Sequence, residues 1–319
     1  MSYKKLSLYV ILIFIIIFPL IIESDYILRV SILILIWGTV STAWSYMGRF
    51  GLISLGHGAF LGIGSYITVL MFNNYNITPI IGIIVAAIFA SILAFIIGYG
   101  CFKYGVLGDY FALVTLALGA LVALILVALR DMTGGSLGIT LESSGNSMMN
   151  LTFEGNIPYY YLSLICLILA IYIWKLIDKS YLRLALVTIE EDEQAASSLG
   201  INVLYSKMIV TIISAIITSL GGALYAIFIS YINPHTVSGV GISLAITFKA
   251  ILGGMFELFG PIIGAAIIVS LEEILRISFG AQLSAVSQIA YGLALLLLII
   301  FMPKGIWGTI KAKFISKNN

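Results

Sequence analysis

The chain has 319 residues, of which 61% are hydrophobic and only 9% are charged. Soluble domains average about 45–50% apolar and about 25% charged residues, so this composition excludes a soluble fold. The net charge of +2, from 16 basic and 14 acidic residues, is too balanced to indicate a nucleic-acid partner. Both cysteines, Cys101 and Cys166, lie in or beside apolar runs, which favours small hydrophobic residues over a disulfide framework or a metal site.

Apolar runs of about the length that crosses a bilayer, roughly 20 residues, recur along the whole chain. We therefore predict an all-α integral membrane protein, a bundle of about ten transmembrane segments in a single transmembrane domain over residues 1–319. The predicted runs are 6–22, 30–47, 51–72, 79–100, 110–129, 158–176, 208–232, 241–255, 258–271 and 283–302. The eighth and ninth runs are short and contain glycine and proline, so helices near 241–271 are expected to be short or broken.

The positions of lysine and arginine predict which side of the membrane each loop faces. With both termini in the cytoplasm, twelve of the 16 basic residues lie on the cytoplasmic side and three on the outer side, as the positive-inside rule requires. Residues 178–207 then form a cytoplasmic loop, and residues 130–157 an extracytoplasmic loop. The first run follows Lys4 and Lys5 like a signal peptide, but no small-residue cleavage site follows it, so we predict that it is retained. Five runs in each half permit an inverted repeat.

The cytoplasmic loop contains a candidate short helix. Acidic residues begin the segment and Gly200 ends it, which suits the helix macrodipole and a glycine stop. Helical spacing would place four residues on one face: Asp192, Ala195, Ala196 and Leu199. Such a face either belongs to a solvated connector between two spans or lets another protein approach closely.

Polar and glycine residues in or beside the spans are candidates for a translocation pathway. An ionisable group within a membrane normally faces the bundle interior, a partner or water, and a neutral His57 bonded to a neighbouring helix is favoured over one that contacts substrate. The glycine-rich turn after the fifth run is either a flexible, solvated loop or a functional one, whose backbone N–H groups form an anion-binding concavity or a lip that contacts a binding protein. The candidate pathway residues are Ser54, His57, Thr133, Gly134, Gly135, Lys249, Gly253, Gly254 and Gly264.

Lys249 is the one basic residue near the middle of a predicted span. An unpaired charge in the membrane costs several kcal/mol, so Lys249 and Glu257 are expected to find partners. The candidate partners are each other, Glu272, Glu273 and Arg276. A substrate carboxylate is an alternative partner for Lys249.

Several sequence blocks, taken in order, resemble the branched-chain amino acid permease family, and specifically its M-type permease subunit. The blocks are GLISLGHGAF at 51–60, TGGSLG at 133–138, EQAASSLGIN at 193–202, SLGGALYA at 219–226, LGG at 252–254, GPIIGA at 260–265 and PKG at 303–305. The third block is similar to the EAA loop of ABC importers, the coupling helix that docks on the ATPase subunit. This resemblance implies a set of ATPase-coupling residues: Glu191, Asp192, Glu193, Ala195, Ala196, Leu199 and Gly200. Glu190 and Glu257 depart from the family pattern, which usually has a basic residue and a small or hydroxyl residue there.

The resemblance implies the membrane-spanning permease subunit of an ATP-binding-cassette importer for branched-chain or related amino acids, located in the bacterial cytoplasmic membrane. The implied partners are the lipid bilayer, two cytoplasmic ATPase subunits, a second related permease and an extracytoplasmic solute-binding protein, with no cofactor. The chain has no GxxxxGK[ST] motif, so we predict a transporter subunit without its own ATPase site rather than an enzyme. Alternatives are a permease for urea, sugars or nucleosides, an ion-coupled transporter using Lys249 and Glu257, and a membrane enzyme.

Overall fold

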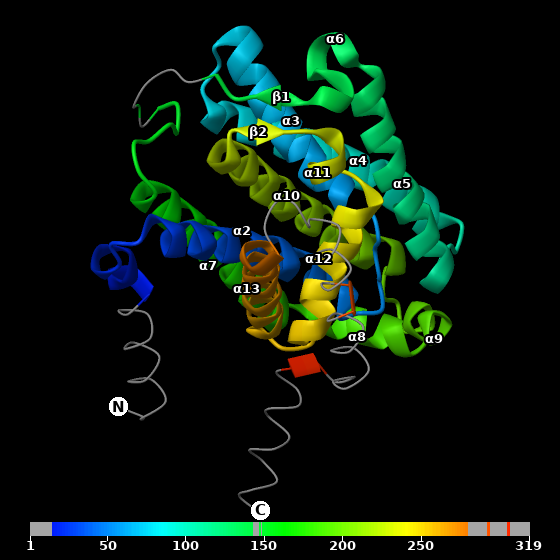
Figure 1. Cartoon of the computed structure of the whole chain (residues 1–319). Helices are drawn as coiled ribbons and strands as arrows, with labels where there is room; N and C mark the ends of the chain where they lie inside the picture. Colours follow the sequence, from blue (N-terminus) through cyan, green and yellow to red (C-terminus); the bar gives the residue numbers. More distant parts are fainter. Residues whose placement is uncertain (1–14, 143–146, 148, 280–291, 294–304, 307–319) are drawn as a thin grey trace, which may run out of the picture.

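Helices form almost all of the regular structure in the computed structural model of the chain (Figure 1). The structure describes residues 15–142, 147, 149–279, 292–293 and 305–306. Most of the first predicted run and nearly all of the tenth, residues 283–302, lie outside the described residues.

Within the described residues, six helical stretches are long and apolar enough to cross a membrane. They are α2 (Asp25–Gly48), α4 (Pro79–Lys103), α5 (Gly108–Ala128), α7 (Ile157–Lys179), α10 (Val203–Ile229) and the stretch Pro234–Gly253, which consists of α11 (Pro234–Val237) and α12 (Val240–Gly253). Two further long helices, α3 (His57–Tyr75) and α13 (Gly260–Phe279), pack within the same bundle. The predicted class, a multi-pass helical membrane protein, is confirmed at this level.

Shorter elements connect the long helices at both ends of the bundle. The segment after α5 contains α6 (Arg130–Thr133), the 3₁₀ helix η1 (Gly135–Leu137) and strand β1 (Ile139–Thr140), and β2 (Tyr231–Ile232) follows α10. The two strands pair antiparallel, with Ile139 opposite Ile232, and so join this segment to the connection after α10. Between α7 and α10 lie α8 (Tyr181–Glu191) and α9 (Glu193–Ser198).

Two helices differ from their predicted ranges for identifiable physical reasons. The third run was expected to begin at Gly51, but α3 begins at His57, because Gly51 has a positive φ of 72° and the carbonyl of Ser54 accepts a 2.7 Å hydrogen bond from the Trp44 indole instead of a helical N–H. The ninth run was expected to be short, but α13 has 20 residues. The part of α13 beyond residue 271, where the predicted run ended, includes Glu273 and Arg276, whose side chains pair at 2.7 Å within the helix.

Close backbone contacts place α10 in the middle of the bundle, between α2 and α3 (Figure 1). A Cβ atom at Gly64 of α3 would overlap the carbonyl oxygen of Ser219 in α10, and one at Gly222 of α10 would overlap the carbonyl oxygen of Leu61 in α3. Small residues at a crossing let two helix backbones approach within lipid, where packing drives association. The two glycines therefore fix how α3 crosses α10.

Candidate functional site

The connection between α7 and α10 folds as two short helices with well-defined ends. Asp192 caps α9, since its Oδ1 accepts hydrogen bonds from the backbone N–H groups of Gln194 at 2.8 Å and Ala195 at 2.9 Å. At the other end Gly200 has a φ of +83°, and Ile201 N–H donates to the Ala196 carbonyl at 3.1 Å. This is the geometry of a Schellman stop, which favours glycine because of the positive φ. The structure thus has a short helix where the acidic start and glycine end predicted one.

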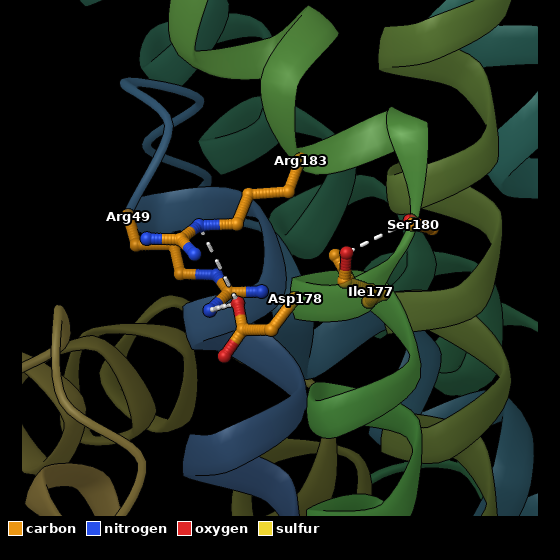
Figure 2. Close-up of polar contacts among 5 residues, drawn as sticks. All are labelled: Arg49, Ile177, Asp178, Ser180 and Arg183. Carbon is orange, nitrogen blue, oxygen red and sulfur yellow. Dashed lines mark hydrogen bonds and ion pairs between the residues drawn. The ribbon is translucent and has the colours of Figure 1, made fainter.

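An ion-pair cluster fixes the start of α8 against the end of α2 (Figure 2). Arg49, which follows α2, donates from Nη1 to Asp178 Oδ1 at 2.7 Å, and Arg183 Nε of α8 lies 3.9 Å from the same oxygen. The Arg49 guanidinium also lies 3.9 Å from the centroid of the Trp174 ring in α7. Burial lowers the pKa of Arg49 and the neighbouring Asp178 opposes that shift. The carboxylate therefore stabilises a cation that has little access to water.

A second ion pair fixes α9 to the first turns of α10. Lys207 Nζ donates to Glu193 Oε2 at 2.5 Å, and the Lys207 side chain is only 4% exposed. Leu186 of α8 is buried in the same hydrophobic cluster as Tyr46 and Ile177. The α8–α9 unit, residues 181–198, is thus attached to α2, α7 and α10, and displacement of this unit would act on all three helices.

The predicted coupling residues do not share one exposed face. Ala196 is fully buried within the chain, whereas Leu199 is 76% exposed and Ala195 is exposed beside it. Asp192 is a cap rather than a member of the helix, and Glu193 is engaged by Lys207. The expected stripe is therefore divided, because α9 has only six residues and its Ala196 side packs on its own protein. Among the predicted coupling residues, Ala195, Leu199 and Gly200 are small or apolar and exposed.

Removing the carboxylate of Asp178 is expected to destabilise the protein. Asp178→Asn should lower the free energy of unfolding by about 1–3 kcal/mol, the usual range for a buried group that loses a charged partner. The loss should be smaller than for a fully buried ion pair, because the Asp178 side chain is partly exposed. The double variant Arg49→Met with Asp178→Asn should recover part of that loss, since no buried cation remains. Thermal unfolding of the purified protein in detergent measures both effects, and a double variant no more stable than the single one would contradict this explanation.

His57 is held by two serines from different parts of the chain. The ring is fully buried, with Nδ1 3.1 Å from Ser54 Oγ and Nε2 2.8 Å from Ser214 Oγ of α10. Ser214 Oγ donates to the Ala43 carbonyl at 2.7 Å, so it can only accept from the ring, which assigns the imidazole proton to Nε2. Both ring nitrogens therefore have partners, and Nε2 bonds to a neighbouring helix, the arrangement that the sequence favoured over a contact with substrate. Ser54 and His57 thereby link α2, α3 and α10.

The glycine-rich turn after α5 uses its polar groups internally. Thr133 is buried, and its hydroxyl bonds to the Leu126 carbonyl and accepts the N–H of Gly135 at 3.2 Å. Gly134 and Gly135 have positive φ values of 71° and 59°, which explains the glycines as turn residues. The segment that follows α5 is therefore a turn held by hydrogen bonds of its own residues.

The glycines around the α12–α13 connection mark a backbone contact. Cβ atoms at Gly253 and Gly264 would overlap backbone atoms of the facing segment, and Gly254 has a φ of +115° at the end of α12. Nearby Lys249, 2% exposed, pairs with Glu272 of α13 at 3.4 Å, one of the alternatives that the sequence left open. The structure thus brings Lys249 and the glycines together at one helix pair, and Thr247 of α12 donates to the Ser54 carbonyl at 3.4 Å.

Sequence reasoning missed the Arg49–Asp178 pair and the surroundings of Lys249. Arg49 and Asp178 are 129 residues apart, so no spacing rule could join them, although each is a charge at the end of an apolar run. The Lys249 side chain lies over the Trp37 ring, 4.8 Å from its centroid, in a cavity that also receives Glu272. Trp37 lies in an unbroken apolar run, which carries no signal that it faces a charge.

Comparison with known proteins identifies the family. The family described as "Branched-chain amino acid transport system / permease component" matches residues 26–302. The high-affinity branched-chain amino acid transport system permease protein LivM of Escherichia coli is 26% identical over 85% of this chain and 67% of its own length. The protein of the same name in Salmonella typhimurium is 27% identical over 82% of this chain and 64% of its own length. The chain thus spans about two thirds of the length of each of these relatives.

A shorter match links the chain to another transporter. The guanosine ABC transporter permease protein NupQ of Bacillus subtilis is 32% identical over 119 residues, 37% of this chain and 36% of its own length. No solved structure matches. Because the family match covers most of the chain, as the ordered sequence blocks had indicated, this protein belongs to the branched-chain amino acid transport system permease family.

Proposed function

We propose that this chain is the translocation subunit of an ATP-driven importer of branched-chain or related amino acids in the bacterial cytoplasmic membrane. Family membership and the names of the two LivM relatives support the substrate class. The local match to NupQ supports a nucleoside permease as a second candidate, but over a much smaller part of the chain.

The observation that carries the proposed mechanism is the attachment of the α8–α9 unit to the bundle. α9 exposes Ala195 and Leu199 on one side and is fixed by Glu193 and Lys207 on the other. In our proposal α9 is the coupling helix, and it lies in a groove of a cytoplasmic ATPase subunit. When two ATPase subunits close on ATP, α9 moves with them. The Glu193–Lys207 pair transmits the displacement to α10. Arg183 of α8, which lies beside the Arg49–Asp178 pair, transmits it to the end of α2.

The proposal includes a topology and further partners. Six candidate spans, α3, α13 and the two apolar runs at 6–22 and 283–302 make ten crossings, with both termini in the cytoplasm. Residues 178–207 are then cytoplasmic, and residues 130–157 face an extracytoplasmic solute-binding protein. A second, related permease completes the membrane unit, and an inverted repeat of the two halves agrees with five crossings in each.

The proposal predicts uptake that needs ATP and the complete set of subunits. Liposomes holding this chain, its related permease and two ATPase subunits should accumulate radiolabelled L-leucine when the binding protein is outside and ATP is at the ATPase face. The same liposomes with a non-hydrolysable ATP analogue serve as the control. Leucine accumulation that follows an ion gradient without ATP would overturn the importer mechanism, and uptake of guanosine but not leucine would select the second candidate.

A further inference from the structure

A charged cavity lies between α2, α10, α12 and α13. Its volume is about 430 Å³, and it is lined by residues from all four helices and from α11. Figure 1 shows α12 and α13 side by side, and both pack against α2. Cavities that bind small molecules have volumes of about 300–1,000 Å³, so this one has room for an amino acid.

The charges in this cavity are unbalanced by one positive unit. Its cationic side chains are those of Arg29, Lys249 and Arg276, and its carboxylates are those of Glu272 and Glu273. Arg276 pairs with Glu273 at 2.7 Å and Lys249 with Glu272 at 3.4 Å. Among the residues that the structure describes, Arg29 has no carboxylate partner and lies 5.8 Å from the Phe228 ring centroid. The cavity therefore favours a ligand that brings a negative group.

Lys249 is the most constrained of these cations. Its side chain is 2% exposed, and its ammonium has three N–H donors. The Glu272 contact at 3.4 Å is longer than the roughly 2.7–2.9 Å of a charge-assisted hydrogen bond, and the Trp37 ring provides a second, weaker contact. A charge buried in a membrane is normally paired with an opposite charge at hydrogen-bond distance. The ammonium of Lys249 therefore has room for a second, closer acceptor.

The lining also offers contacts for the ammonium group and the side chain of an amino acid. The carboxylates of Glu272 and Glu273 can accept hydrogen bonds from an ammonium group, and Leu33, Ile242 and Trp37 present apolar surface. We infer that this cavity binds the zwitterionic head group of an α-amino acid, with the substrate carboxylate on Lys249, the substrate ammonium on Glu272 and an apolar side chain against Leu33 and Ile242. The inference rests on the proposed function and locates its substrate. A site with paired charges of this kind disfavours urea, sugars and nucleosides, which are uncharged.

Direct binding to the permease–ATPase complex in nanodiscs, without the binding protein, tests the inference. Radiolabelled L-leucine is the probe, and unlabelled L-leucine should displace it. L-Leucinol, which lacks the carboxylate, and 4-methylpentanoate, which lacks the ammonium, should each compete at least about tenfold more weakly, since each loses a charged hydrogen bond. Equal competition by either analogue, or by urea, ribose or guanosine, would overturn the inference.

Paired variants separate substrate recognition from a purely structural ion pair. Lys249→Met should weaken leucine binding at least about tenfold, and Lys249→Met with Glu272→Gln should bind no better, because both ligand contacts are gone. If the pair only stabilised the fold, the double variant would regain binding. Lys103→Met, at an exposed lysine on α4, is the matched control and should bind normally.

Two readouts keep the inference distinct from the proposed function. Co-purified ATPase subunits show that each variant is assembled, and if Lys249→Met does not assemble, the analogue series on the unaltered complex decides. A wild-type complex that fails to take up leucine with ATP refutes the proposed function. A wild-type complex that does take it up, with normal leucine binding by Lys249→Met, refutes only this site.

Discussion

Leu199→Asp is expected to abolish ATP-driven uptake while the chain remains folded in the membrane. Leu199 is 76% exposed, so the fold does not depend on its side chain, whereas a carboxylate in an apolar docking groove would be desolvated without a partner. Loss of a central interface residue typically costs about 2 kcal/mol or more, roughly thirtyfold in affinity. The measurement is co-purification of the ATPase subunits together with ATP-dependent leucine uptake.

Ala195→Trp should have a similar effect for a different reason, because a large side chain would hold α9 away from the groove. Glu193→Lys and Ala196→Trp are less informative, since they disturb the Lys207 pair and a fully buried side chain of this protein. Tyr104→Asp is the matched control: Tyr104 is 78% exposed and lies between α4 and α5. Retained ATPase binding by Leu199→Asp and Ala195→Trp would show that α9 is a solvated connector.

Gly64→Ala is expected to disrupt the packing of α3 against α10. The new methyl group would overlap the carbonyl oxygen of Ser219, a backbone atom that cannot move without moving α10. Overpacking of this kind typically costs about 1–3 kcal/mol and occasionally more, and Gly64→Leu should prevent assembly. Gly222→Ala should behave like Gly64→Ala, because Gly222 meets the Leu61 carbonyl in the reciprocal contact.

Gly100→Ala supplies the control for this prediction. Gly100 is a helical glycine of α4 with no atom within 4 Å of the position that a Cβ would occupy, so alanine should be neutral or stabilise by about 0.5–1 kcal/mol through helix propensity. Thermal unfolding in detergent compares the variants. Equal midpoints for Gly64→Ala and Gly100→Ala would contradict a packing role for Gly64.

Local patterns account for the parts of this protein that sequence predicted well. The apolar runs at 79–100, 110–129 and 158–176 became α4, α5 and α7 with ends within a few residues, since a segment in lipid must satisfy its own backbone hydrogen bonds. The acidic start and the glycine stop likewise predicted α9, because capping depends on neighbours in the chain.

The relations between helices came only from the tertiary structure. The sequence could single out Lys249 and His57 as polar residues within spans. Their partners lie 23 and 157 positions further along the chain, at Glu272 and Ser214, and meet them only because of how whole helices rotate and cross. Ala195 is exposed and Ala196 is buried although the two residues are adjacent and identical, because they lie on different sides of α9 and only one side faces the rest of the chain. Hydrophobicity along the chain therefore determined that this protein spans a membrane and roughly where. Close packing of distant segments decided which polar groups meet, because lipid-facing and buried faces are both apolar, so hydrophobicity alone does not show which face of a helix meets which neighbour.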